Sequence, residues 1–327
     1  MSLSVKEILS LGKKRLADSG VADADIDSKA LYCYMTNISN AKLILEYQNI
    51  LQDMLCDEYF SLIDRRASGI PLQYITGTQE FMGFEFDVDE NVLIPRQDTE
   101  TLVEDAISVI NDRCIRGDDV TVPKGKQWDV LDLCCGSGAI GISIAKLCEG
   151  TKVTCSDVSE GAIFVAKRNG AKNGVEKKVT FTCGDLFEPF KGFMKSKKFD
   201  LIISNPPYIE SDVIPTLQRE VKDHEPMSAL DGGADGLDFY KLIISQSPEM
   251  LKKGGVLMFE IGHNQGQAVC NLLEETGCFE QIRCEKDLVG HDRIVFATLV
   301  DLKAKKKREK KEEKAAKKAG KAETAEK

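Results

Sequence analysis

Four consecutive residues, Asn205-Pro206-Pro207-Tyr208, carry groups that could hold an amide or an amine. The Asn205 carboxamide can accept one hydrogen bond and donate two, the Pro206 carbonyl can accept, and the Tyr208 ring can lie against a planar group. The apolar run before them predicts a buried strand, which the two prolines must end because they lack N–H groups. This pattern predicts a pocket for a flat group bearing NH2. On the tetrapeptide alone, a tight strand exit is the favoured alternative.

A second stretch, Asp132 to Gly141, has the spacing of a nucleotide-binding loop. Gly136, Gly138 and Gly141 fit G-x-G-x-x-G, and glycines let the backbone turn sharply and approach a ligand closely. Asp157 ends the next predicted strand, nineteen positions after Gly138, where a carboxylate can hold both hydroxyls of a ribose. Taken alone, the glycine spacing suggests NAD.

Two further acids oppose the NAD interpretation. Asp132 immediately precedes the loop, where it would repel a pyrophosphate but attract an ammonium group. Asp185 follows the third predicted strand, where it suits an adenine amine. A ligand with a ribose, an adenine and an ammonium but no phosphate is S-adenosylmethionine, which we predict as the cofactor.

The elements around these stretches alternate between strand and helix from Trp128 onward. This alternation predicts an α/β fold with a doubly wound sheet and helices on both faces. The expected strands are 129–133, 153–156, 179–183, 199–204 and 256–261, with a closing hairpin at 279–284 and 293–299. The expected helices are 139–147, 160–169, 238–251 and 265–275, with Lys252-Lys253-Gly254-Gly255 at the exit of the third.

The first part of the chain has a different pattern. Residues 1–75 are predicted to form a small helical domain, which begins at the capping box Ser4-x-x-Glu7. Residues 76–97 predict a linker containing a β-hairpin. Residues 98–302 form the main domain, whose first helix Asp98 or Thr99 could cap.

Composition limits the possible partners and compartment. The chain of 327 residues has no apolar run long enough for a membrane span and no signal-peptide pattern, so we expect a cytoplasmic protein without membrane contact. Eleven scattered cysteines and three histidines show no zinc spacing, which favours free thiols and no metal.

Charge is distributed unevenly along the chain. The net charge is −9, but residues 303–327 carry twelve basic and five acidic residues, or +7, which leaves −16 for residues 1–302. An acidic body argues against a catalytic surface for nucleic acid. The Lys-rich tail cannot bury a core and is expected to be disordered, with weak RNA or ribosome contact as a minority hypothesis.

The ordered motifs resemble those of the release factor glutamine methyltransferases. The resemblance covers about residues 5–300. It rests on Pro71–Gly77, on Leu93-Ile94-Pro95-Arg96-x-x-Thr99-Glu100, on the Asp132 loop, on Asn205–Ile209, on Glu225–Leu237, on Glu260-Ile261-Gly262 with Gln265, and on Asp287–Arg293. Several motifs in this order are far more specific than any one of them.

The resemblance implies a seven-stranded class I methyltransferase domain behind a substrate-recognition helical domain. It implies methylation of the Gln side-chain amide in the Gly-Gly-Gln motif of peptide-chain release factors. By the same resemblance, Cys134, Cys135, Gly136, Ser137 and Gly138 cradle the cofactor, together with Asp132. Asp157 binds its ribose, Asp185 and Leu186 flank its adenine, and Asn205 to Tyr208 hold the Gln amide. The chain departs from the family pattern at Cys134, Cys135, Leu186 and His224.

Two other functions remain open at this point. Asn-Pro-Pro-Tyr also serves an exocyclic amine, so an adenine amino-methyltransferase acting on DNA or RNA is the alternative enzyme. The acidic body and the lack of a basic, aromatic-rich recognition domain oppose it. A non-catalytic adaptor is the alternative of another class, and the intact Asp132, Asp157 and Asn205 set opposes it.

Overall fold

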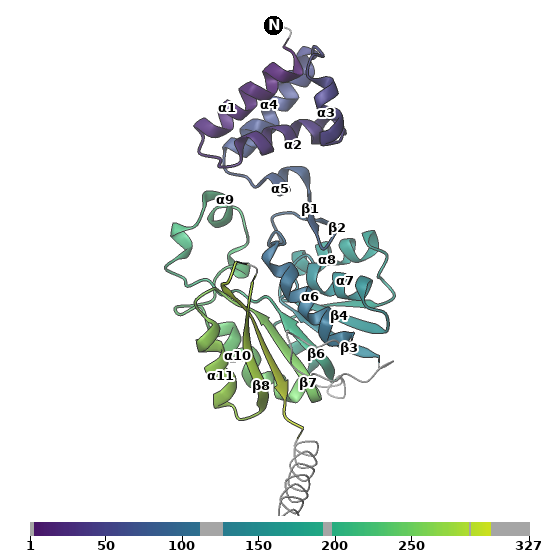
Figure 1. The fold of residues 1–327 in the computed structure, drawn as a ribbon, viewed down its shortest axis with the longest axis vertical. Helices are drawn as coiled ribbons and strands as arrows, with labels where there is room; N and C mark the ends of the chain where they lie inside the picture. Colours follow the sequence, from purple (N-terminus) through teal and green to yellow (C-terminus); the bar gives the residue numbers. More distant parts are fainter. Residues whose placement is uncertain (1–2, 112–126, 192–197, 288, 302–327) are drawn as a thin grey trace, which may run out of the picture.

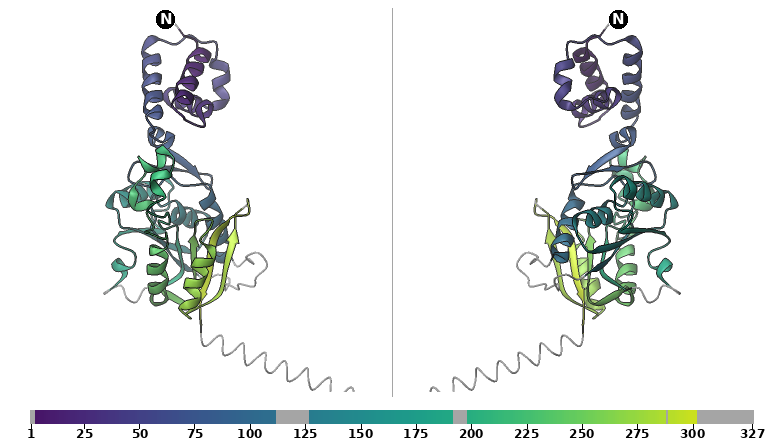
Figure 2. Two further views of the ribbon diagram at one scale, coloured as in Figure 1. Left: turned by 90° about the vertical axis from the view of Figure 1, so that its left-hand side faces the viewer. Right: turned by 90° about the vertical axis from the view of Figure 1, so that its right-hand side faces the viewer.

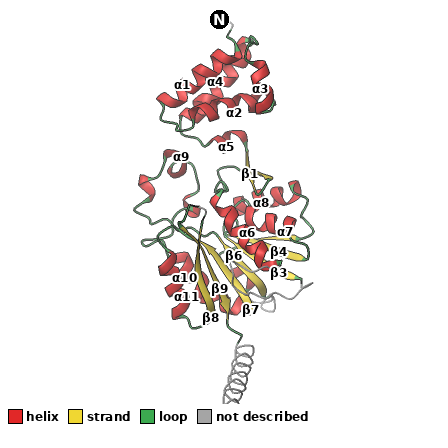
Figure 3. Cartoon of the chain, in the orientation of Figure 1, coloured by secondary structure: helices red, strands yellow, loops and turns green. Residues whose placement is uncertain are grey.

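The structure, a computed structural model, describes residues 3–111, 127–191, 198–287 and 289–301. Figure 1 shows a bundle of helices at the N-terminal end, a short two-stranded ribbon, and a large sheet with helices on both sides. Figure 3 shows that helices alone make up the bundle, whereas strands and helices alternate in the larger part. The predicted Lys-rich tail, 303–327, lies outside the described residues. No helix of the described residues is long and apolar enough to cross a membrane.

Five helices build the N-terminal bundle. They are α1 (Val5–Asp18), α2 (Ala24–Thr36), α3 (Asn40–Glu46), α4 (Asp53–Ala67) and α5 (Leu72–Thr76). The predicted capping box at Ser4 and Glu7 is confirmed, since each side chain bonds the other residue's backbone N–H. Apolar residues of the first four helices pack into one shared, buried cluster, which includes Ile8, Leu31 and Tyr59. The bundle therefore has a hydrophobic core of its own.

A buried ion network connects the bundle to the rest of the protein. Arg66 in α4 donates through Nε to Asp27 of α2 at 2.7 Å, and both side chains are buried. The Nη2 atom of Arg66 lies 2.6 Å from Oε2 of Glu220. Glu220 belongs to α9 (Arg219–Lys222), a short helix that follows β6 (Phe199–Ser204) in the sequence. Figure 1 shows α9 next to the bundle. Arg66 thus pairs with one carboxylate of the bundle, Asp27, and one carboxylate from outside it, Glu220.

We expect Arg66→Ala to lower the free energy of unfolding by roughly 3–5 kcal/mol, because it leaves the Asp27 carboxylate buried without its partner. Urea denaturation measures this loss. Arg65→Ala, which removes an exposed neighbour on the same helix, serves as the control and should change stability by less than about 0.5 kcal/mol. Equal losses of stability in the two variants would contradict a stabilising role for the buried Arg66–Asp27 ion pair.

The ribbon and the following helix attach the linker to the main sheet. Strands β1 (Thr78–Phe81) and β2 (Phe84–Asp87) pair antiparallel, as the alternation predicts. Asn169 clamps the end of β2 with two hydrogen bonds to the Asp87 backbone, at 2.6 and 2.9 Å. Helix α6 (Asp98–Ile110) begins without a side-chain cap, so the predicted capping role of Asp98 or Thr99 is wrong. The Thr99 hydroxyl has another partner, described below.

The large sheet has seven strands in the order β5-β4-β3-β6-β7-β9-β8. The strands are β3 (Trp128–Leu133), β4 (Thr151–Asp157), β5 (Val179–Cys183), β6 (Phe199–Ser204), β7 (Leu251–Glu260), β8 (Phe279–Lys286) and β9 (Asp292–Leu299). All neighbours from β5 to β7 are parallel, and β9 pairs antiparallel with both β7 and β8. The predicted doubly wound sheet and its closing hairpin are confirmed.

Helices cover both faces of this sheet, as the side views in Figure 2 show. The remaining long helices are α7 (Ala139–Leu147), α8 (Glu160–Lys172), α10 (Asp238–Met250) and α11 (Gly266–Glu275). Along β6, Leu201 and Ile203 join the cluster under α6, α7 and α8, whereas Ile202 joins the cluster under α10 and α11. This alternation, together with full burial, explains why the strand reads as a continuous apolar run.

One predicted helix end is wrong. Lys252 to Gly255 lie inside β7 rather than at the exit of α10, which ends at Met250. Lys252 does not cap the helix, because its ammonium pairs with Asp129 and Asp200 at 2.7 and 2.8 Å. These acids lie at the start of β3 and β6, so the lysine ties together the amino ends of three parallel strands.

Candidate active site

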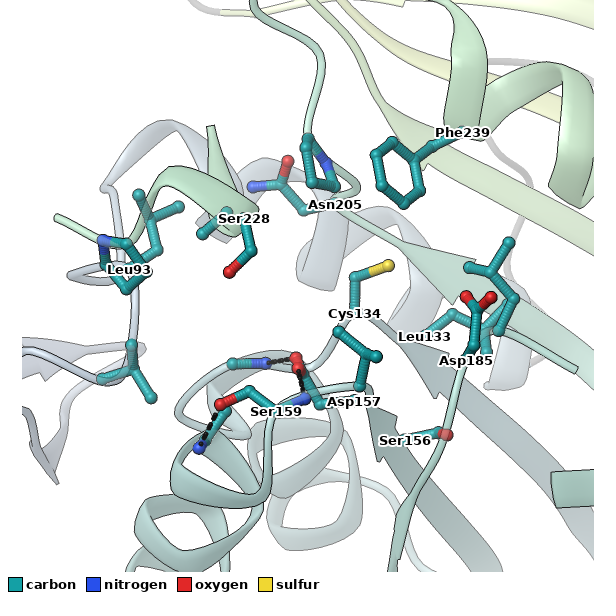
Figure 4. A pocket seen from close by; sticks show the side chains of 18 of the residues that line it. Leu93, Leu133, Cys134, Ser156, Asp157, Ser159, Asp185, Asn205, Ser228 and Phe239 are labelled. Atoms are coloured by element: carbon teal, nitrogen blue, oxygen red, sulfur yellow. Dashed lines mark hydrogen bonds between the residues drawn. The ribbon is translucent and has the colours of Figure 1, made fainter. Parts of the chain in front are cut away.

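A cavity of about 340 Å³ lies at the carboxyl ends of β3, β4 and β6. The chain runs outward from β3 through β4 to β5 and then returns to β6 on the other side, so this is the sheet's switch point. Open α/β sheets bind their ligands there. In the view of Figure 4, Asn205 and Asp157 lie on opposite sides of the cavity, with Cys134 between them.

The loop after β3 forms one wall of the cavity. Cys134, Gly136 and Gly138 have φ angles of 56°, 52° and 79°, so the loop makes a left-handed turn before α7. Cys134 adopts a conformation that favours glycine, and its side chain lines the cavity beside Gly136. Burial raises the pKa of the Cys134 thiol, which keeps it neutral. Cys135, Ser137 and Gly138 support the loop but do not line the cavity.

Asp157 lies at the end of β4 and faces the cavity. Its Oδ2 accepts from the Gly136 N–H and its Oδ1 from the Ser159 N–H, each at 2.9 Å. Burial raises the pKa of Asp157, although these backbone bonds partly offset the rise. A carboxylate fixed in this way still offers lone pairs to two neighbouring hydroxyls.

Asp132 lies beneath the loop rather than in the cavity wall. The side chain is fully buried, and its Oδ2 accepts from the Gly141 N–H at 2.9 Å, which anchors the start of α7. Burial raises the pKa of Asp132 to about 7. Its Oδ1 has no hydrogen-bond partner among the described residues, so it can accept from a further donor.

The far end of the cavity combines one acid with apolar side chains. Asp185 and Leu186 follow β5 and line the cavity, as the sequence suggested. Figure 4 places Phe239, from the first turn of α10, on the same side of the cavity as Asp185. Phe239 was not predicted from the sequence, where its only signal is an aromatic residue two positions after the Glu225–Leu237 motif. An aromatic ring and an acid at this end suit a purine with an exocyclic amine.

The Asn205–Tyr208 segment leaves β6 and is clamped from behind. The Gln265 side chain donates to the Tyr208 carbonyl at 2.9 Å and to the Gly236 carbonyl at 3.2 Å. Asn205 and Pro207 line the cavity, while Pro206 and Tyr208 do not. Tyr208 packs against the cluster under α10, and burial raises the pKa of its hydroxyl. No hydrogen bond among the described residues ends on the Pro206 carbonyl.

The Gly232 backbone presses directly on this segment. A Cβ at Gly232 would lie 2.7 Å from the Tyr208 Cα and 2.9 Å from the Pro207 carbonyl oxygen. Hydrogen bonds between Ile209 and Leu230 and between Gly232 and Ile209, at 3.0 and 2.8 Å, hold the two stretches together. These hydrogen bonds keep the Asn205–Tyr208 segment from moving away from a side chain added at Gly232.

We expect Gly232→Ala to lower turnover by about 100-fold, because displacing a reacting group by about 1 Å can cost that much. Steady-state kinetics measures it. Gly277→Ala, in a remote turn where a Cβ meets nothing within 4 Å but φ is +63°, controls for backbone strain and lost stability away from the cavity. Normal turnover in Gly232→Ala would show that the segment is not held by this contact.

Arg96 forms an ion pair with an acid from a distant part of the chain. Its Nη2 lies 2.5 Å from Oε2 of Glu225, whose side chain is buried. Burial raises the pKa of Glu225, and Arg96 counters that rise. The pair joins the linker before α6 to the Glu225-Pro226 motif, whose next residues line the cavity beside Leu93 (Figure 4).

The sheet order, the cavity at its switch point and the acid at the end of β4 define a class I methyltransferase. A family profile described as the PrmC N-terminal domain matches residues 7–77, and one described as the methyltransferase small domain matches residues 120–221. Among solved structures, the hMettl16 catalytic domain in complex with an RNA hairpin is 12% identical, with a TM-score of 0.50, over 77% of this chain and 84% of that one. That likeness concerns the fold.

Relatives specify the family. The release factor glutamine methyltransferase of Clostridium acetobutylicum is 42% identical over 83% of this chain and 90% of its own length. Those of Clostridium botulinum and Geobacter sulfurreducens are 37% and 38% identical, over 90% and 89% of this chain and 98% and 95% of their own. The chain belongs to the release factor glutamine methyltransferase family.

Proposed function

We propose that this protein transfers a methyl group to the side-chain amide nitrogen of the Gln in the Gly-Gly-Gln motif of peptide-chain release factors. The observation that supports this most is the position of Asn205. It lies at the end of β6 on the wall of a cavity whose other walls carry Asp157 and Asp185. An amide acceptor and a nucleoside site thus share one cavity.

The cofactor is S-adenosylmethionine, which supplies an electrophilic methyl group on a sulfonium. The residues of this chain fit it. The cavity is in the size range of small-molecule sites, and three carboxylates, Asp157, Asp185 and Asp231, line it without an opposing lysine or arginine in the lining. Asp157 would hold the ribose hydroxyls and Asp185 the adenine amine. Asp132, which lies beneath the loop with an unpartnered Oδ1, would attract the ammonium through its charge.

The substrate amide nitrogen is a poor nucleophile because its lone pair is delocalised into the carbonyl. Asn205 Oδ1 and the Pro206 carbonyl would accept its two hydrogens, which orients the nitrogen and increases its electron density. Such positioning can supply up to roughly 7–11 kcal/mol in ideal cases. Asp231 is a further carboxylate in the lining, but its Oδ1 accepts from the Ser211 hydroxyl and the Gly233 N–H, at 2.7 and 2.9 Å. We assign no general base, so proton loss would follow methyl transfer.

The remaining assignments follow from the same proposal. We assign residues 1–75 to recognition of the release factor, residues 76–97 to the link between the two parts, and residues 98–302 to catalysis. The free cysteines of the described residues fit a reducing cytoplasm. An adenine amino-methyltransferase is the weaker candidate, because no observation of the site favours it over the amide.

A labelled-methyl assay tests the proposal. Purified release factor, its Gly-Gly-Gln→Gly-Gly-Ala variant, and DNA and RNA are each incubated with the enzyme and methyl-labelled S-adenosylmethionine. We expect label only in the unmodified release factor, on the Gln side chain by mass spectrometry. Label in nucleic acid and none in the release factor would replace this proposal with the alternative.

A further inference from the structure

Two buried side chains that do not line the cavity contact Asn205. Its Nδ2 donates to the Thr99 hydroxyl at 3.3 Å. Thr99 is the second residue of α6, and Glu260 is the last residue of β7 and only 1% exposed. Glu260 follows Phe259, which pairs with Ser204 in the sheet, so its carboxyl lies beside the Thr99 hydroxyl and the Asn205 carboxamide. Its Oε2 has no hydrogen-bond partner among the described residues. Three distant parts of the chain therefore meet behind the reacting segment.

The donors and acceptors of this cluster fit together in one way. An ionised carboxylate only accepts, so both groups that contact Glu260 must donate to it. The Thr99 hydroxyl uses its hydrogen for Glu260, because its oxygen already accepts from Asn205. Asn205 must then present its NH2, not its oxygen, to Thr99 and Glu260. Its Oδ1 receives no hydrogen bond from the described residues, which leaves it for a substrate.

The charges around Glu260 set when it is ionised. Burial raises its pKa to about 7, and the Thr99 hydrogen bond and the charge of Arg293 in β9 limit the rise. Asp98 of α6 opposes ionisation, and the hydroxyl groups of Tyr208 and Tyr240 also face this carboxyl. Below neutral pH a protonated Glu260 gains a donor, which would permit the reversed carboxamide.

We propose that Glu260, acting together with Thr99, is a positioning residue that fixes the Asn205 carboxamide with its NH2 inward and its Oδ1 toward the substrate amide. This inference rests on the proposed function. If Thr99 and Glu260 have this role, the turnover of the enzyme depends on two residues that touch neither substrate nor cofactor.

The first test compares two replacements of Thr99. Thr99→Val keeps the shape but removes the hydroxyl, and we expect kcat on release factor to fall about 10-fold or more, the effect of losing a hydrogen bond to a charged group. Thr99→Ser keeps the hydroxyl and should stay within about 3-fold of wild type. The Kd of S-adenosylhomocysteine by calorimetry should not change. Equal kcat values for Val and Ser would overturn the proposal.

The second test uses the pH profile of Glu260→Gln at saturating cofactor, so that titration of Asp132 does not enter through cofactor affinity. Wild-type kcat should rise from about pH 6 to about pH 8 as Glu260 ionises, and the rise should be lost in Glu260→Gln. Arg293 keeps its ion pairs with Asp98 and Asp287, at 3.1 and 3.2 Å, so the variant leaves no buried charge unpaired. Glu104→Gln, on the exposed face of α6, is the control.

The double variant decides whether the two residues act as a unit. Thr99→Val with Glu260→Gln should lose about as much kcat as the worse single variant. A loss equal to the product of the single losses, or an unchanged pH profile in Glu260→Gln, would overturn the inference. Wild-type turnover on release factor is measured alongside, and its absence would refute the proposed function instead.

Discussion

Asn205→Ala is expected to retain cofactor binding and to lose turnover by about 100- to 1000-fold. In the proposed mechanism the carboxamide contributes the acceptor that orients the substrate amide, and removal of one preorganised polar group at a reacting centre costs about this much. The two carboxylates that we propose hold the cofactor, Asp157 and Asp185, are untouched, so the Kd of S-adenosylhomocysteine should stay within about 2-fold. Single-turnover kinetics with release factor and calorimetry measure the two quantities.

Asn271→Ala, an exposed replacement on α11, is the matched control and should behave as wild type. The interpretation of Asn205 as a substrate ligand depends on separating the two measurements. A variant that loses cofactor affinity and turnover in equal measure would show that Asn205 acts on the cofactor instead. Near-normal turnover would remove Asn205 from the mechanism.

Asp157→Asn is expected to weaken cofactor binding by about 10- to 100-fold, the range for hydrogen bonds to a charged group. The replacement keeps the volume but removes the charge and one acceptor. Asp157 also accepts from Gly136 and Ser159, so the amide cannot satisfy these donors and a ribose together. Turnover at saturating cofactor should fall much less than affinity.

Because burial raises the pKa of Asp157, calorimetry is done at about pH 8 to measure the affinity. Asp212→Asn, which changes the same group at an exposed position, controls for the loss of one negative charge. An unchanged Kd for Asp157→Asn would contradict the assignment of the ribose site to this acid.

The regular part of the fold was predictable because burial and turn residues act locally. The predicted bounds of α7, β5 and β6 agree with the structure at both ends. Prediction failed at Lys252 to Gly255, where cations and glycines imitate a helix exit. Their partners, Asp129 and Asp200, lie far away in the sequence, so only the packed sheet shows why a strand continues through them.

The residues around the cavity were predictable where they stand at a strand end. Asp157 ends β4, Asp185 and Asn205 come just after β5 and β6, and all three line one cavity because parallel strands bring their carboxyl ends to one edge. The supporting contacts were not predictable in the same way. Thr99 suggested a helix cap, and Glu260 belonged to a family motif near a strand end without a predicted role. Their place beside Asn205 depends on how α6 and β7 pack. The burial of Asp132 beneath its loop likewise follows from packing against α7.

A crystal structure of the protein with S-adenosylhomocysteine and a release factor tests the central claim most directly. We predict the adenosine between Asp157 and Asp185, and the Gln side-chain nitrogen within about 3.2 Å of both the Asn205 Oδ1 and the Pro206 carbonyl oxygen. A complex in which the Gln amide contacts neither acceptor, or in which the homocysteine sulfur points away from Asn205, would contradict the account.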